Sequence, residues 1–196
     1  MRPKLKHGKH GRVTEVEIYP IIYQPVIDVE KNGLCAYYYG RRDYTDIQKY
    51  RQEISLVFHN ENFTRSRLIN HLYEWLRRLI YGRRVDIETF YAHVEHSQVT
   101  GLSFPGIYSS TATWHETAHA DHKQPTPIRP VQDFYTEAKT MPYIYVNTWN
   151  HSLAPHDNNS DLRKRGYCPY HIIEPFHTIE INYATRQHLE RKYRNK

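Results

Sequence analysis

Residues Thr64 to Tyr81 read TRSRLINHLYEWLRRLIY and carry the strongest periodic pattern in the chain. Their leucines and isoleucines recur every three or four positions, which places them on one face of an α-helix. Thr64 is a suitable N-cap residue, and Gly82 stands where a left-handed residue would end the helix. The opposite face is polar and basic. We therefore predict a core helix with a solvated basic face, around which the rest of the chain is organised.

Two more helices are predicted on either side of this segment. Thr45 and Gln48 have the spacing of a capping box, and apolar residues at helical intervals follow to about Phe58. Asp86 is a candidate N-cap for a third helix over residues 87–96. Three consecutive helices would form a small helical unit over residues 44–97.

The remaining segments are less regular. Residues 1–12 are predicted to form a basic N-terminal arm, and residues 13–43 an extended or edge-strand segment, because Pro20 and Pro25 cannot donate to a central ladder. Residues 98–196 are punctuated by proline and read as an extended region with short helices, which would order against a partner. The predicted fold class is mainly α, with irregular extended segments: a small helical unit, Pro/Tyr-rich arms and a few short strands.

Composition indicates an acidic partner. The chain has 196 residues, a net charge of +6 with histidine neutral, and 18 tyrosines among its apolar residues. Tyrosine suits half-buried positions and contact surfaces, and a basic balance favours acidic surfaces. Cys35 and Cys168 are too few for a disulfide framework, which indicates a reducing, intracellular compartment. No apolar run reaches the ~18 residues that a membrane-spanning helix requires, so no membrane span is predicted.

One pentapeptide could carry chemistry. His115, Glu116 and His119 fit the pattern H-E-x-x-H, which on a helix presents two imidazoles for Zn²⁺ and a glutamate that can take a proton from the metal-bound water. The pentapeptide resembles the zinc metallopeptidases of that kind, over these five residues. The resemblance implies a zinc hydrolase with Glu116 as the catalytic residue, and Glu137 is a possible third ligand. A non-catalytic metal site or a solvated histidine cluster is the other interpretation of the same residues.

Basic and aromatic residues alternate at several places in the chain. This combination suits an acidic protein surface, where arginine and tyrosine are common contact residues, and it also suits single-stranded nucleic acid. No glycine-rich phosphate loop and no recognised RNA-binding motif is present. The candidate partner-binding residues are Tyr37, Tyr38, Tyr39, Arg41, Arg42, Arg77, Arg78, Arg83, Arg84, Arg163, Lys164 and Arg165.

The function predicted from these patterns is a non-catalytic structural or accessory subunit, without a cofactor, that docks onto a large acidic assembly. The tubulin lattice of ciliary microtubules is the favoured host, by analogy of composition, and a ribonucleoprotein particle is the next. A cytoskeletal or ciliary location follows from the first choice. The alternative function is the zinc-dependent hydrolase, and RNA binding through the arginine and tyrosine patches is a third possibility.

Overall fold

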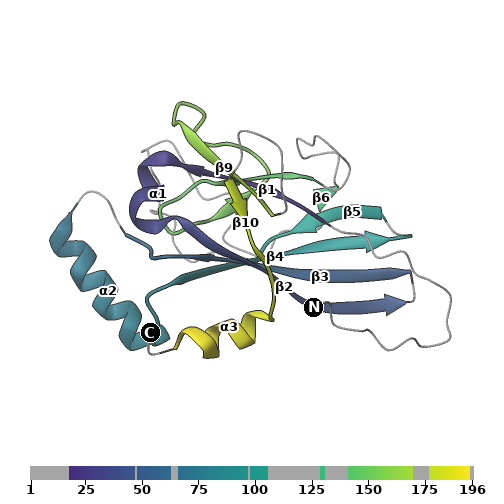
Figure 1. Cartoon of the computed structure of the whole chain (residues 1–196), viewed down its shortest axis with the longest axis horizontal. Coiled ribbons are helices and arrows are strands. Elements are labelled where there is room, and N and C mark those ends of the chain that lie inside the picture. The colour runs from purple at the N-terminus through teal and green to yellow at the C-terminus, as the bar shows by residue number, and fades with distance from the viewer. Residues whose placement is uncertain are drawn as a thin grey trace.

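The computed structural model describes residues 18–46, 48–62, 66–96, 98–105, 129–130, 141–169 and 177–194. Within these residues, strands dominate. Two mixed β-sheets of five and six strands make up the body of the molecule, and three helices lie around them (Figure 1). The predicted mainly α fold is therefore wrong.

The first sheet is built around a strand from the N-terminal segment. Its strands follow the order β10-β9-β1-β7-β8. Their bounds are β1 (Ile21–Pro25), β7 (Tyr143–Val146), β8 (Leu153–Ala154), β9 (Lys164–Pro169) and β10 (His177–Ile179). β1 is central, parallel to β7 and antiparallel to β9, and α1 (Val26–Asn32) follows it. The predicted edge strand is wrong because Pro20 precedes β1 and Pro25 ends it, so neither proline interrupts the ladder.

The second sheet replaces most of the predicted helical unit. Its order is β11-β2-β3-β4-β5-β6. The bounds are β2 (Leu34–Asp46), β3 (Lys49–Phe58), β4 (Asp86–Glu95), β5 (Gln98–Ser103), β6 (Arg129–Pro130) and β11 (Ile181–Tyr183). In β3 the inward positions alternate, as Tyr50, Gln52 and Ile54 are buried and the residues between them are not. That period of two is typical of a strand.

The predicted capping box forms a turn instead. The Asp46 carboxylate accepts a hydrogen bond of 2.7 Å from the backbone N–H of Gln48, at the tip of the hairpin between β2 and β3. Aspartate often forms such local bonds in turns. The third predicted helix is β4, which pairs with β3 along its whole length.

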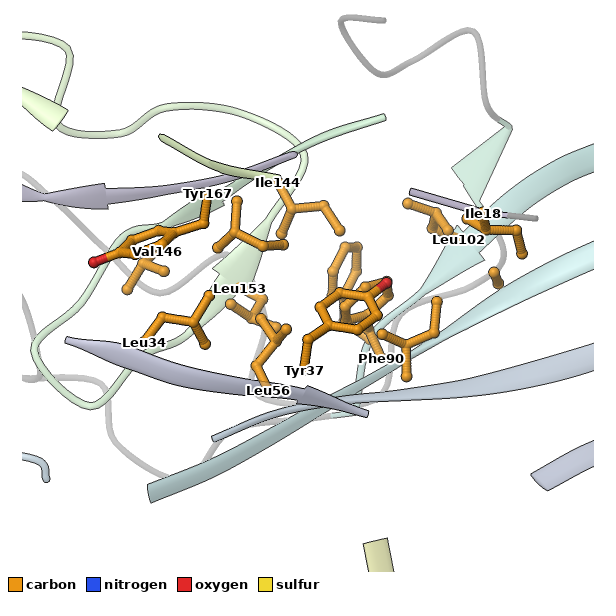
Figure 2. Packing of buried hydrophobic residues seen from close by; sticks show 14 of the residues in the cluster. Ile18, Leu34, Tyr37, Leu56, Phe90, Leu102, Ile144, Val146, Leu153 and Tyr167 are labelled. Atoms are coloured by element: carbon orange, nitrogen blue, oxygen red, sulfur yellow. The ribbon is translucent and has the colours of Figure 1, made fainter. Parts of the chain in front are cut away.

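The main hydrophobic core lies between the sheets. Figure 2 shows Ile144 and Tyr167 on one side of this core and Leu34, Tyr37 and Leu56 on the other, and all of these residues belong, with Leu153, to one buried cluster. The second half of the chain thus supplies one side of the core. The prediction that residues 98–196 form arms that order only on a partner is wrong for 141–169 and 177–194, because these residues pair with β1 and β2.

Two helices lie outside the sheets. α3 (Arg186–Tyr193) covers the outer face of the second sheet, where Leu189 packs with Tyr38, Val57 and Ile87. α2 (Arg67–Tyr81) stands at the end of the molecule, beside the ends of the strands (Figure 1). The predicted helix and its C-cap are confirmed. Gly82 has a left-handed backbone with φ 67°, and its N–H donates a hydrogen bond to the carbonyl of Arg78. The N-cap is Ser66, not Thr64, because the Ser66 hydroxyl accepts from the Ile69 N–H.

Candidate functional site

The apolar side of α2 faces solvent. Leu68 is 80% exposed, and even Leu76, the least exposed of the set, is 40% exposed. We call this surface the apolar face of α2, and it consists of Leu68, Ile69, Leu72, Trp75, Leu76, Leu79 and Ile80. An amphipathic helix on a globular protein ordinarily turns such a face towards the core. The prediction of a core helix is therefore wrong, because the apolar side of this helix faces solvent instead of the core.

The polar side of α2 faces the protein. Asn70, Tyr73, Glu74 and Arg77 share this side, since they follow each other at intervals of three, one and three residues. Tyr73 donates a 2.7 Å hydrogen bond to the Glu61 carboxylate, and Asn60 donates one of 2.8 Å to Glu74. The Tyr73 ring also packs edge-on against Trp149, with 5.1 Å between ring centroids. Polar contacts, together with this one aromatic pair, hold α2 in place.

Arg77 anchors the helix in a group of buried charges. Its guanidinium lies 3.1 Å from the Glu61 carboxylate and 3.5 Å from that of Asp86. Arg83, just beyond the helix, lies 3.9 Å from Asp86 and 2.7 Å from Glu190 of α3. We call Asp28, Glu61, Arg77, Arg83, Asp86 and His151 the buried ionic cluster, and all six residues are buried.

His151 joins the two carboxylates at the centre of this cluster. Its Nδ1 lies 2.8 Å from Asp86 and its Nε2 lies 3.1 Å from Asp28. Both ring nitrogens thus face a carboxylate oxygen, which requires both to carry a proton. The ring is stacked on Phe58, with 3.9 Å between centroids and an interplanar angle of 8°. The geometry is that of a buried imidazolium between two carboxylates.

The pKa values in the cluster agree with this charge state. Burial alone would lower the pKa of His151, but the carboxylates of Asp28 and Asp86 overcome that effect and raise it to about 10. Burial opposes ionisation of Asp86 too, yet the hydrogen bond from His151 and the nearby arginines lower its pKa to about 2. For Glu61, burial and the charge of Asp86 raise the pKa to about 7, against the attraction of Arg77. His151 is therefore charged at neutral pH and Asp86 is ionised.

The loop that carries His151 is fixed by asparagines. Asn147 donates to the His156 carbonyl over 2.7 Å, and Asn159 donates to the Asn147 carbonyl over 2.9 Å. His151 itself adopts a left-handed backbone with φ 55°. A non-glycine residue in that region is strained, so the surrounding contacts must hold it there.

The orientation of α2 can be tested by two substitutions. We expect Leu72→Gln to change the free energy of unfolding by no more than about 0.5 kcal/mol, because the side chain is exposed. Leu56→Ala, in the core between the sheets, is expected to cost about 2–5 kcal/mol. Urea unfolding of both variants measures this difference. A loss of several kcal/mol for Leu72→Gln would mean that the apolar face is buried against the protein.

The predicted partner-binding residues separate into internal and exposed groups. Tyr37 lies in the core, Tyr38 lies beneath α3, and half-buried Tyr39 donates to the Ile18 carbonyl. Arg77 and Arg83 belong to the buried ionic cluster. Two further basic residues are partly engaged: Lys164 lies 2.6 Å from Asp157, and Arg42 donates to Gln52 over 2.7 Å.

The remaining predicted residues lie nearer the surface. Arg41, Arg78, Arg84 and Arg163 are exposed, and Arg165 is half-buried. Arg41 forms an ion pair of 2.9 Å with Asp43 at the end of β2. Arg78 lies on α2 itself, and Arg84 follows two residues after its C-cap, so both are exposed on or next to the helix whose apolar face sequence reasoning had assigned to the core.

The predicted zinc residues His115, Glu116, His119 and Glu137 lie outside the described residues. The hypothesis of a zinc hydrolase thus stays a prediction. In the part of the chain that the structure describes, no group of three or more histidine, cysteine, aspartate or glutamate side chains is arranged to hold a metal ion.

No protein-family model, curated protein or solved structure matches this chain. Among the described helices, none is long and apolar enough to cross a bilayer.

Sequence reasoning did not find the buried ionic cluster. Its members lie far apart in sequence, since Asp28 and His151 are separated by 123 positions and Asp86 and His151 by 65. Each is an ordinary polar residue in its local context. One local signal was available, namely the polar stripe of Asn70, Tyr73, Glu74 and Arg77, which is as periodic as the apolar stripe beside it.

Proposed function

We propose that this protein is a non-catalytic docking subunit that joins a larger assembly through the apolar face of α2. The observation that carries the proposal is an amphipathic helix whose polar side is fixed inside the protein and whose large apolar side chains face solvent. Contiguous exposed apolar patches of this kind mark interaction sites in soluble proteins.

The size of the surface supports this role. Seven large apolar side chains, each at least 40% exposed, would stabilise a complex by roughly 10 kcal/mol if they were buried. Association itself costs about 4–15 kcal/mol. The apolar face can thus supply most of the affinity of a stable complex, and polar contacts around it would supply the remainder and the specificity.

The host of the assembly is proposed from charge. The net charge of +6, the exposed Arg78 on α2 and the exposed Arg84 just beyond the helix favour an acidic host. The tubulin lattice of ciliary microtubules remains the first choice and a ribonucleoprotein particle the second, inside a reducing compartment. Co-sedimentation with polymerised tubulin, at low and at physiological salt, tests the first choice with a defined host.

Site-specific cross-linking tests the docking role itself. A photo-reactive amino acid at Leu72 or Leu79 is expected to give one dominant cross-linked product in cells of the native source. The same group at Tyr183, which is 83% exposed on β11, is the control and is expected to give none. Adding Leu76→Glu to the Leu72 variant should abolish the product. Equal cross-linking from all positions, or insensitivity to Leu76→Glu, would contradict a docking role for α2.

A further inference from the structure

The apolar face of α2 has a charged border on one side only. Each residue of an α-helix is rotated by about 100° around the axis from the one before it, so the seven residues of this face span about 140° of the helix circumference. Arg67, His71 and Arg78 follow one border of the arc, and all three are exposed. The other border meets Tyr73, which turns into the protein towards Glu61. The exposed border of the apolar face is therefore basic.

No acidic side chain of α2 offsets this border. Glu74 is the only acidic residue in the helix, and it accepts a hydrogen bond from Asn60 on the inward side. Arg84 adds an exposed positive charge just beyond the C-terminus of the helix. A surface that covers the apolar face thus meets positive charge along its edge that no acidic side chain of α2 balances.

This one-sided border disfavours a second copy of the chain as the occupant. Two-fold self-association brings identical surfaces together, and in an antiparallel helix pair each border meets the same border of the other copy. Arg67 and Arg78 of one copy would then lie along the basic border of the other. Juxtaposed like charges oppose such pairing.

The shape and polarity of the site also favour protein over a bilayer. An interfacial membrane helix presents lysine and arginine across its polar face, while its apolar face enters the lipid. The polar face of α2 is instead committed to Glu61, Asp86 and Asn60 inside the molecule. α2 projects at the end of the molecule (Figure 1), and its anchors Leu68, Leu72, Trp75 and Leu79 have the spacing of a helix that enters a groove.

We propose that the occupant of the apolar face of α2 is an apolar groove on another protein whose rim carries aspartate and glutamate. The groove would take up Leu72, Trp75 and Leu79, and its acidic rim would pair with Arg67 and Arg78. This inference rests on the proposed docking function and specifies the chemistry of the partner at the same surface.

Two defined probes test the inference. Each is a designed antiparallel two-helix peptide with the same leucine-lined groove, and its rims carry glutamate in one probe and lysine in the other. Titration of the labelled probes with the full chain, followed by fluorescence anisotropy, is expected to give at least tenfold tighter binding of the glutamate probe at low salt. The double variant Arg67→Gln, Arg78→Gln should remove most of that preference, and high salt should do the same.

Trp75→Ala separates the inference from the docking function on which it rests. This substitution is expected to weaken both probes at least tenfold, because an aromatic anchor at the centre of an interface carries much of the affinity. If both probes bind equally and Trp75→Ala weakens both, the docking function of the apolar face is supported and the proposal of an acidic partner is contradicted. If Trp75→Ala changes neither affinity, the docking function itself is contradicted.

The other occupants give distinct results. Self-association in analytical ultracentrifugation at micromolar concentration, lost in Leu76→Glu and without binding of either probe, would identify a second copy as the occupant. Binding to phosphatidylserine vesicles, with no binding of either probe, would identify an anionic bilayer. Failure to bind the glutamate probe, the lysine probe and the vesicles would equally overturn the proposal.

Discussion

Arg77→Met is expected to lower the free energy of unfolding at neutral pH by about 3–5 kcal/mol. The guanidinium lies within 3.5 Å of both Glu61 and Asp86, and its side chain is only 4% exposed. Methionine keeps most of the volume but removes the charge, so that two buried carboxylates lose a partner. Such a loss is a large fraction of the roughly 5–15 kcal/mol that stabilises an ordinary domain.

The neighbouring arginine supplies a matched control. Arg78 follows Arg77 directly but is exposed, so we expect Arg78→Met to change stability by no more than about 0.5 kcal/mol. Urea unfolding, followed by far-UV circular dichroism, measures both variants. Equal effects of the two substitutions would show that α2 is not anchored through Arg77.

The loss in Arg77→Met should also depend on pH. The pKa of Glu61 is already raised to about 7 by burial and by Asp86, and removal of Arg77 raises it further. At low pH, Glu61 in the variant is protonated and therefore neutral, so that no unpaired charge is buried. Above neutrality Glu61 is ionised, and its buried charge has lost its arginine partner. We expect a smaller loss near pH 6 than near pH 8.5, and Glu61→Gln in the Arg77→Met background should recover part of the stability at the higher pH.

The second large effect is the loss of stability at alkaline pH that His151 imposes. The folded pKa of His151 is about 10, above its ordinary value of 6.5. Its charged contacts with Asp28 and Asp86 therefore stabilise the protein fully below pH 6.5, and this contribution is lost as the pH rises through 10. The slope between those values is up to about 1.4 kcal/mol per pH unit, and the whole contribution is on the order of 5 kcal/mol.

Unfolding is measured between about pH 7 and pH 9, because tyrosine and lysine titrate at higher pH in ordinary surroundings. Glu61, whose pKa burial and Asp86 raise to about 7, titrates at the lower end of this range in both proteins, so the difference between the wild type and a His151 variant gives the effect of His151. We expect His151→Gln to be less stable than the wild type at pH 7 and to lack most of the decline with pH. His156→Gln, an exposed histidine in the same loop, is the control and should keep the decline. A wild-type stability that stays flat over this range would mean that His151 is neutral in the folded protein.

The sequence identified α2 and its end but not its orientation. Periodicity assigns residues to faces of a helix, and Gly82 marks the end because a left-handed residue is favoured there. Which face turns inward depends on what the rest of the chain offers to it. Here that surface carries Glu61, Asp86 and His151, and it favours the arginine side of the helix over the leucine side.

The two incorrectly predicted helices have a different cause. In residues 45–58 and 87–96, apolar residues fit a helical spacing, but buried side chains such as Ile54 and Phe90 also fit an alternation of two. Pairing of β3 with both β2 and β4 decided the outcome, because the ladder bonds the backbone groups of all three strands. Such pairing partners cannot be identified from a short window of sequence.

By itself, the sequence determined a basic, tyrosine-rich chain with one strongly amphipathic helix ended by glycine, because charge, composition and local periodicity belong to neighbouring residues. Only the tertiary structure decided that the helix turns its apolar side outward and that His151 lies between two carboxylates. These features arise where segments distant in sequence come into contact. A buried charge is stable only when the fold also buries an oppositely charged or hydrogen-bonding partner beside it.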